Sequence, residues 1–522
     1  MKAHSKCSLA SHYITWQVTD SHGVPAAGGW LRRPRIGWLP AAVGLAAALV
    51  GIAAALHYSA LGLTLSHYDA KAHLVVARRI LDSLTPGWEQ IGAVWLPLPH
   101  LINMLPVQLD YFYRTGAFAV AISILANALA GASIAWTVQA LTASASGALL
   151  AAGLYLANPD VLYLQSTPMT EPLVFGLTSL QVALFTRWVL SGRLEPPAAA
   201  GWVTVLAVLT RYEAWPITGA CLLASAFAWW RRGNALTRVL RVHARLALYP
   251  VCAVLGFMAF SRITVGEWFV SSGFFVPDET LRGQPAAVYE KVLEGVQLLG
   301  GVWLVRFSRV AVLLVGALAL ATAGRAPMLI PFALFGAGAL PVSAYLAGHP
   351  FRMRYEIPLV IACAVATGLG VGLLRRMAPI IAAVVLAVVV FEVRPFDPDA
   401  PMIAEAQIDR NVHAREHVTG CLRQRYHGGT IMMSMGALGH YMQELSHAGF
   451  AIRDFLHEGN HPMWDSAFTR GPGALVRFVV VEEAAEGGDA IIQRQRVYPR
   501  LLEDFDRVCE GGNVALYQRK TP

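Results

Sequence analysis

The sequence is poor in charged residues. Lys, Arg, Asp and Glu make up 14% of the 522 residues, and 56% of the residues are hydrophobic, whereas a soluble domain is about 25% charged. Long apolar runs recur between residues 36 and 393, and about 20 apolar residues are enough to cross a bilayer. One such run could be a buried core helix, but about ten cannot all be. The composition therefore predicts a polytopic membrane protein.

Three common sequence signals are missing. Residues 1–35 lack the short apolar segment and cleavage site of a signal peptide and end in Arg32, Arg33 and Arg35, which predicts a cytoplasmic N-terminal tail. Gly436 and Gly439 do not form a dinucleotide-binding fingerprint. No basic run is interleaved with aromatic residues, so the net charge of +8 does not indicate nucleic-acid binding.

The charge is unevenly distributed along the chain. Residues 395–522 contain 13 basic and 17 acidic residues, a balance of −4, so the rest of the chain carries +12. Five arginines crowd the segment between two apolar runs at residues 231–245, and Arg375 and Arg376 mark another basic loop. By the positive-inside rule both loops are cytoplasmic, and the excess charge is that of cytoplasmic loops.

The number of spans must leave the N-terminal tail and both basic loops on the cytoplasmic side, and this condition sets the topology. We expect 11 to 12 transmembrane helices over residues 36–393, and 11 if the segment 93–110, with Pro97, Pro99 and Pro106, is re-entrant or broken. The loops predicted to face outward are 65–92, 158–170, the 210–213 corner, 268–306 and 348–354. The C-terminal domain, 395–522, is predicted to be extracytoplasmic as well.

That C-terminal domain has the pattern of a small soluble α/β domain. Its expected strands are 430–434, 476–481 and 513–518, and its expected helices are 436–445 and 490–505. Cys421 and Cys509 lie in it and could pair in an oxidising compartment. Cys221, Cys252 and Cys363 lie in apolar runs and are interpreted as small core residues.

Five polar clusters border the outward ends of the predicted spans, where polar residues are candidates for function. The first is His67-Tyr68-Asp69, opening a helix that we expect to lie on the membrane surface, with Lys71 and His73 on it. Asp69 could take a proton from a hydroxyl, or it could simply cap the helix. His67 and His73 are interpreted as interfacial packing residues rather than metal ligands.

The other four clusters have structural alternatives too. Glu171 begins a span and could complement its helix dipole. Arg211 and Glu213 would point apart on a helix, so mutual pairing is not expected, and Arg211 suits a lipid phosphate or a salt bridge to another span. Arg352, Arg354 and Tyr355 precede another span and oppose the positive-inside trend, where anionic headgroups are an alternative ligand. The fifth cluster, residues 274–279 in the 268–306 loop, could cover a site or supply interfacial aromatics.

In this order, the clusters resemble the glycosyltransferase-C superfamily, and specifically its branch of dolichyl-phosphate-mannose protein mannosyltransferases and lipid A aminoarabinose transferases. The resemblance covers about residues 36–393. It is carried by Tyr68-Asp69 and the following helix through Asp82, Trp95–His100, Asn158-Pro159 with Ser166–Pro172, Thr210–Glu213 and Arg354-Tyr355. It departs from the protein mannosyltransferases at Ala70, which stands where they have a second acid.

The resemblance implies a sugar transferred from a polyprenyl-phosphate carrier to a hydroxyl of a glycan, lipid or protein acceptor outside the inner or plasma membrane. Asp69 would be the catalytic base and Glu171 a second acidic site residue. Arg211 and Arg354 would hold the lipid phosphate, and we place Glu213, Arg352, Tyr355, Lys71 and His73 among the substrate-binding residues. No cofactor is assigned, and a divalent metal stays open because some relatives use one and others do not.

A single displacement by this chemistry inverts the anomeric carbon. It uses a lipid-activated sugar, so no nucleotide-binding loop is required. The alternatives are a transporter or flippase of lipid-linked sugars, for which we find no inverted repeat, and a non-catalytic assembly factor.

Overall fold

The computed structural model describes residues 37–269, 277–409, 412–485 and 487–520. Eight helical segments in this part of the chain are long and apolar enough to cross a membrane. They are α1 (Leu39–Ala60), α5 (Ala117–Thr142), α8 (Glu171–Leu190), α11 (Leu236–Thr264), α13 (Val302–Ala321), η3 with α14 (Ala323–Leu346), η4 with α15 (Met353–Gly372) and η5 with α16 (Arg375–Val393). The chain is therefore an integral membrane protein with multiple spans.

The number of full-length spans is lower than the 11 to 12 expected. Part of the difference lies in apolar runs that fold into shorter helices: α6 (Ala145–Leu156), α7 (Pro159–Leu164) and α9 (Ala198–Val208). Helix α10 (Ala214–Arg231) has 18 residues but is not among the eight. Asn158 ends the run that begins with α6, because its side chain accepts a hydrogen bond from Val161 N–H and starts a new helix there. Composition alone does not show such breaks.

The proline-rich segment 93–110 contains no spanning helix. Its longest helix is α3 (Leu98–Asn103), with six residues, followed by the 3₁₀ turn η2 (Pro106–Gln108). At 1.5 Å per residue six residues cannot cross a core of about 30 Å. A short 3₁₀ turn, η1 (Trp88–Ile91), precedes it, and α4 (Asp110–Thr115) leads into α5.

Two predicted loops are partly helical. The arginine-rich loop at 231–245 is mostly helical, since α11 begins at Leu236 and carries Arg238, Arg241 and Arg245 in its first turns. The long loop 268–306 contains the helix α12 (Pro285–Gly300) and the start of α13. Phe274, Phe275 and Val276 lie outside the described residues.

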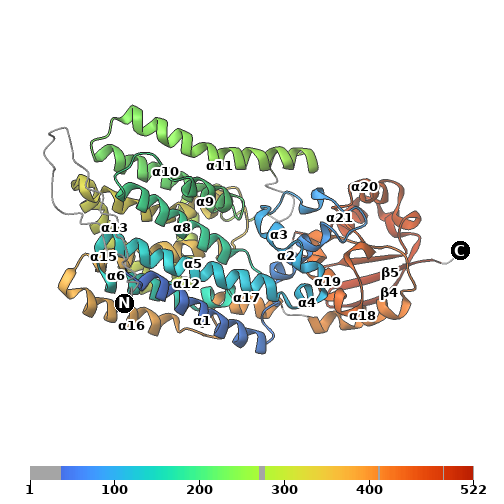
Figure 1. The fold of residues 1–522 in the computed structure, drawn as a ribbon. Helices are drawn as coiled ribbons and strands as arrows, with labels where there is room; N and C mark the ends of the chain where they lie inside the picture. The colour runs from blue at the N-terminus through green and yellow to red at the C-terminus, as the bar shows by residue number, and fades with distance from the viewer. Residues whose placement is uncertain (1–36, 270–276, 410–411, 486, 521–522) are drawn as a thin grey trace, which may run out of the picture. The chain divides into compact units, whose positions relative to one another are not determined.

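The long helices pack closely. Helix α5 lies between α1 and α8, and α6 packs against α15 (Figure 1). Glycine makes the second contact tight: a methyl group at Gly368 would lie 2.5 Å from Ala151 Cβ and 2.7 Å from the Gly147 carbonyl oxygen. Small residues at a helix crossing are a common device of membrane proteins.

The C-terminal domain is built on a five-stranded mixed sheet, as the α/β prediction requires. Its order is β2 (Phe455–Leu456), β1 (Ile431–Met433), β3 (Phe478–Glu482), β5 (Val514–Arg519) and β4 (Phe505–Gly511). Strands β2, β1 and β3 are parallel, whereas β5 is antiparallel to β3 and β4.

The helices of the C-terminal domain are α17 (Pro401–Asp409), α18 (Val412–Arg425), α19 (Met435–Leu445), α20 (His461–Arg470) and α21 (Ala490–Val497). The expected helix 490–505 is wrong beyond Val497, where a 3₁₀ turn, η9 (Pro499–Leu502), leads into β4. The remaining 3₁₀ turns of the domain are η6 (Ser446–Ala448), η7 (Ile452–Asp454) and η8 (Pro472–Ala474).

A disulfide joins α18 to β4. Cys421 and Cys509 are bonded, with their Cα atoms 6.6 Å apart. Of the cysteines interpreted as core residues, Cys221 and Cys363 are buried, but Cys252 is exposed on α11.

Helix α2 (Tyr68–Arg79) does not lie on a surface. Every residue from Asp69 to Arg79 is buried, because α19 packs along the helix. Leu74, Val75 and Ala77 share one hydrophobic core with residues of the C-terminal domain, among them Leu438, Tyr441 and Met442. The amphipathic pattern that suggested a membrane surface is satisfied instead by another part of the same chain.

Candidate active site

The N-terminal end of α2 carries Asp69 into a buried ion pair. Asp69 is 8% exposed, and its Oδ2 pairs with Nη1 of Arg354, which comes from η4 (Met353–Glu356). Although burial alone would raise it, the Arg354 guanidinium holds the pKa of the Asp69 carboxyl well below its usual range. Asp69 is therefore ionised at neutral pH.

Asp69 does not cap its own helix, so that structural alternative is wrong. The cap is His67, whose Nδ1 accepts a hydrogen bond from Asp69 N–H at 3.2 Å. The Asp69 side chain is thus left to bind other groups, as a catalytic role requires.

A second ion pair is centred on Arg211. Its Nη1 lies 2.9 Å from Glu171 Oε1 and 2.9 Å from Thr170 Oγ1, and its Nη2 lies 2.6 Å from Glu213 Oε1. The expectation that Arg211 and Glu213 do not pair is wrong, because residues 209–213 form a turn between α9 and α10 rather than a helix. Burial opposes its charge, but the two carboxylates raise the pKa of Arg211 above its usual range.

Glu171 is the least satisfied member of this cluster. It is 1% exposed, and within the described residues neither of its oxygens receives a well-directed hydrogen bond, despite the contact with Arg211. A buried carboxylate without well-directed donors costs free energy, and in a native structure such a group calls for an explanation, of which a catalytic role is one.

The two ion pairs belong to one cluster. The Arg354 guanidinium interacts electrostatically with Arg211 and with Glu171, so the two ion pairs lie close together. The Tyr355 ring lies 5.9 Å from the Arg354 guanidinium. The fold thus brings together six residues that the sequence analysis took from separate segments: Asp69, Glu171, Arg211, Glu213, Arg354 and Tyr355.

His73 lies at the edge of this cluster, one turn after Asp69. Its Nδ1 is 3.1 Å from His100 Nε2, and its ring packs 4.2 Å from that of Trp95. Burial, together with His100, lowers the pKa of His73 well below its usual range, and burial near Arg79 lowers the pKa of His100 to about 3. Both rings are therefore neutral, in line with packing residues.

Two predicted binding residues have other contacts in the structure. Lys71 pairs with Glu444 of α19, which also binds Arg415 of α18. Arg352 is fixed through its backbone, whose N–H and carbonyl both bond to the Tyr345 hydroxyl, at 3.2 and 3.1 Å. A role for either in holding a phosphate stays a prediction.

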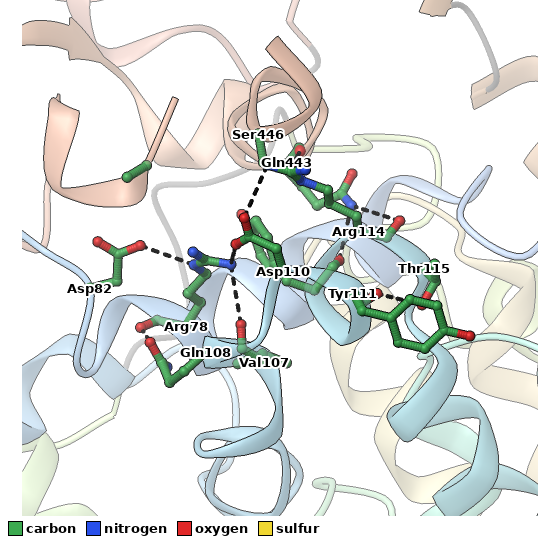
Figure 2. Close-up of polar contacts among 12 residues, drawn as sticks. Arg78, Asp82, Val107, Gln108, Asp110, Tyr111, Arg114, Thr115, Gln443 and Ser446 are labelled. Carbon is green, nitrogen blue, oxygen red and sulfur yellow. Dashed lines mark hydrogen bonds and ion pairs between the residues drawn. The ribbon is translucent and has the colours of Figure 1, made fainter. Parts of the chain in front are cut away.

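The other end of α2 is held by a separate polar network (Figure 2). Arg78 pairs with Asp82 at 2.9 Å and with Asp110 at 2.8 Å, and it donates to the Val107 carbonyl at 3.3 Å. Gln443 of α19 donates to the Tyr113 carbonyl at 3.1 Å. The helix that carries Asp69 is therefore fixed at both ends.

Sequence reasoning missed the contribution of α17. Glu405 and Asp409 of this helix contact the His67–Tyr68 segment, although both were assigned to the soluble domain. Their partners are far away in the sequence, and no local pattern marks such a pairing. Within the described residues, no group of three or more His, Cys, Asp or Glu side chains is arranged to hold a metal ion.

Comparison with known proteins identifies the fold. The searches against family models and curated sequences returned no match. Among solved structures, the chain is similar to ArnT from Cupriavidus metallidurans bound to undecaprenyl phosphate, with a TM-score of 0.58, 13% identity, and coverage of 92% of this chain and 97% of that one. The apo state of the same ArnT gives a TM-score of 0.57 at 14% identity, covering 91% of this chain and 98% of that one.

The chain therefore has the ArnT fold over almost its whole length. The likeness to ArnT is one of fold, and it extends beyond residues 36–393 into the C-terminal domain. At this identity the likeness establishes architecture, and function is argued from the site.

Proposed function

We propose that the protein is a membrane glycosyltransferase that moves a sugar from a polyprenyl-phosphate carrier to an acceptor hydroxyl outside the membrane. The observation that carries the proposal is the buried pairing of Asp69 with Arg354, beside Arg211 and Glu171, in a chain with the fold of ArnT. One solved ArnT structure contains undecaprenyl phosphate, which makes a polyprenyl phosphate the expected donor carrier.

The arginines suit a lipid phosphate. A guanidinium presents several donors in one plane and stays charged when buried, so it can hold phosphate oxygens by two parallel hydrogen bonds. Arg354 and Arg211 supply two such groups in adjacent positions. As the sugar leaves, the phosphate changes from a diester to a monoester and gains one negative charge, which these donors stabilise.

Asp69 is the proposed general base. It takes the proton of the acceptor hydroxyl while the oxygen forms a bond to the anomeric carbon and the bond from that carbon to the phosphate oxygen breaks. A single displacement inverts the anomeric centre. The proton neutralises Asp69 as the phosphate gains a charge, so the total charge of the site stays constant and Arg354 can turn from the carboxyl to the phosphate.

The low pKa of Asp69 fits this exchange. While Arg354 faces it, Asp69 is ionised but weakly basic. When the donor is bound, Arg354 also faces its phosphate, so the pairing of Arg354 with Asp69 weakens. The pKa of Asp69 then rises, and the carboxylate becomes a better base. The remaining ion pair, Arg211 with Glu171 and Glu213, keeps the second guanidinium in position.

Donor binding tests the role of Arg354. We expect undecaprenyl phosphate to raise the unfolding temperature of the purified protein in nanodiscs, and Arg354→Gln to weaken binding at least about tenfold, the value of one charge-assisted contact. The control is Arg282→Gln, because Arg282 is exposed and its ion pair within the described residues is a local one with Glu279. Equal binding by both variants would remove Arg354 from the phosphate site.

Turnover separates an enzyme from a transporter. Incubation with a panel of undecaprenyl-phosphate sugars should release or transfer sugar at a rate above that of empty nanodiscs. Absence of turnover, with scrambling of the same lipids in vesicles, would favour the transporter.

A further inference from the structure

The helix that carries Asp69 has an imidazole as its N-cap. His67 is 2% exposed, and its Nδ1 accepts the Asp69 N–H hydrogen bond at 3.2 Å. Ser, Thr, Asp and Asn are the usual caps, and they accept in any protonation state found near neutral pH. An imidazole nitrogen accepts only when it carries no proton. The cap therefore requires a neutral His67 with its proton on Nε2.

Glu405 stands where it favours that tautomer. Its Oε1 lies 3.5 Å from His67 Nε2, close enough for its charge to act, although within the described residues Nε2 has no well-directed hydrogen bond. Asp409 Oδ2 faces the other ring nitrogen, Nδ1, at 4.0 Å. The nearer carboxylate, Glu405, draws the imidazole proton to Nε2. Although burial raises it, the pairing with His67 lowers the pKa of Glu405 overall, so the carboxyl is ionised. Four residues later, Asp409 accepts a hydrogen bond from Tyr68 N–H at 2.9 Å.

Helix α17, which carries both acids, is firmly anchored. Met402, Ile403 and Ala406 are buried in the main hydrophobic core. Met402 N–H donates to Asp160 Oδ1 at 2.8 Å. The helix also packs against η4, the turn that carries Arg354. One rigid element thus contacts the segments that supply both members of the Asp69–Arg354 pair.

We propose that Glu405 is a positioning residue for the transfer reaction, acting through His67 to hold Asp69 in its reactive orientation. The inference rests on the proposed function. Glu405 does not contact the reacting atoms. It fixes the ring whose Nδ1 holds the first turn of α2, and Asp69 is part of that turn.

The contacts of His67 predict how transfer activity depends on pH. The charged or titratable groups facing His67 are Glu405 and Asp409 from α17, Asp69 from α2, Arg354 from η4 and Tyr163 from α7. Burial and Arg354 disfavour the charged ring, but the acids prevail and the pKa of His67 is raised. Protonation puts a hydrogen on Nδ1 and breaks the cap, so activity falls as the pH drops through the pKa of His67.

Enzyme kinetics test the link from Glu405 through His67 to Asp69 with Glu405→Gln, His67→Asn and the double variant. Glu405→Gln should lower kcat about 10-fold to 100-fold, the usual cost of removing an outer-shell partner, with little change in KM for the donor. It should also move the acidic limb of the pH profile to lower pH, because it removes a carboxylate that favours charged His67. The control, Glu416→Gln, changes an exposed acid whose partner among the described residues is His413, and it should alter neither quantity.

His67→Asn makes the test specific. Asparagine caps a helix through its side-chain oxygen without a tautomer to fix, so this variant should keep much of the activity and lose the acidic limb. In that background, Glu405→Gln should cost less than about twofold. Equal losses from Glu405→Gln in both backgrounds, or an unmoved acidic limb, would overturn the inference.

Nitrogen-15 NMR of the histidine rings gives a readout independent of turnover. The His67 signal is identified by its absence in His67→Asn. In the wild type we expect its proton on Nε2, and in Glu405→Gln a lower pKa and a mixed tautomer. A proton on Nδ1, or spectra unchanged by Glu405→Gln, would overturn the inference even if the enzyme is active. If the wild type transfers no sugar, the proposed function fails and the NMR result alone decides whether Glu405 controls the His67 cap.

Discussion

At the scale of single residues, the site is a balance of buried charges. Three carboxylates, Asp69, Glu171 and Glu213, face two guanidiniums, Arg211 and Arg354. Breaking a buried pair is costly because the remaining charge is left uncompensated. The balance also determines which substitutions can be interpreted as effects on chemistry rather than on folding.

Glu171 and Glu213 give the sharpest comparison. Glu171→Gln should leave the unfolding free energy within about 1 kcal/mol of the wild type, since Arg211 keeps Glu213 and Thr170 and the glutamine adds a donor to a carboxylate-rich position. It should nevertheless reduce sugar transfer. Thermal unfolding and transfer assays on the same preparations measure both effects.

Glu213→Gln is the matched variant. It weakens two hydrogen bonds from Arg211, at 2.6 and 3.0 Å, and should destabilise the protein by about 1.5–3 kcal/mol, the value of bonds to a charged group. If Glu171→Gln proves the more destabilising of the two, Glu171 is a structural rather than a functional acid.

Much of this cluster could be predicted from the sequence, since polar residues at the ends of apolar runs stand out against them. Asp69, Glu171, Arg211 and Arg354 were found in this way. Their pairing could not be predicted, because it depends on turns such as 209–213 that bring neighbours face to face. The partner of Lys71 could not be predicted either, because Glu444 lies far away in the sequence.

At the scale of elements, apolar runs predicted helices better than they predicted spans. Helices α1, α5 and α8 match expected runs, whereas the breaks at Asn158 and Pro97 depend on capping and proline geometry. In the C-terminal domain, the buried strands β1, β3 and β5 were expected. Strand β2 has only two residues, and β4 is largely polar, so neither has a hydrophobic pattern to detect.

Helix packing gives a prediction at this scale. Gly368→Val should destabilise the protein by about 1–3 kcal/mol through overpacking, because its new side chain would meet Ala151 Cβ and the Gly147 carbonyl of α6. Gly316→Val on α13 is the control, since no atom of the described residues lies within 4 Å of the added Cβ. Equal melting temperatures for the two variants would mean that α6 and α15 do not approach as described.

At the scale of the whole molecule, the C-terminal domain and α2, the helix that carries Asp69, form one folded unit. Helix α19 packs along α2, the Tyr68 hydroxyl donates to the Gly436 carbonyl at 2.8 Å, and Glu444 neutralises Lys71. A domain boundary was predicted at residue 395 because the composition of the sequence changes there. Contacts between distant segments have no signature in composition, so their union could not be predicted.

The disulfide tests which side of the membrane this unit faces. Disulfides persist in oxidising compartments, and we expect the Cys421–Cys509 bond to place the domain outside. In intact cells, a membrane-impermeant maleimide should label these cysteines only after mild reduction. The Cys421→Ser/Cys509→Ser variant supplies the background from other cysteines. Labelling that requires cell lysis would reverse the proposed orientation.

The central claim is that Asp69 accepts the proton of the acceptor hydroxyl. The most direct measurement is the rate of sugar transfer from an undecaprenyl-phosphate sugar by Asp69→Asn, compared with the wild type at equal amounts of folded protein. Asparagine preserves the size of the side chain and removes its basicity, so we expect a loss of about 100-fold to 10,000-fold, the usual contribution of a general base. A rate within a few-fold of the wild type would contradict the account.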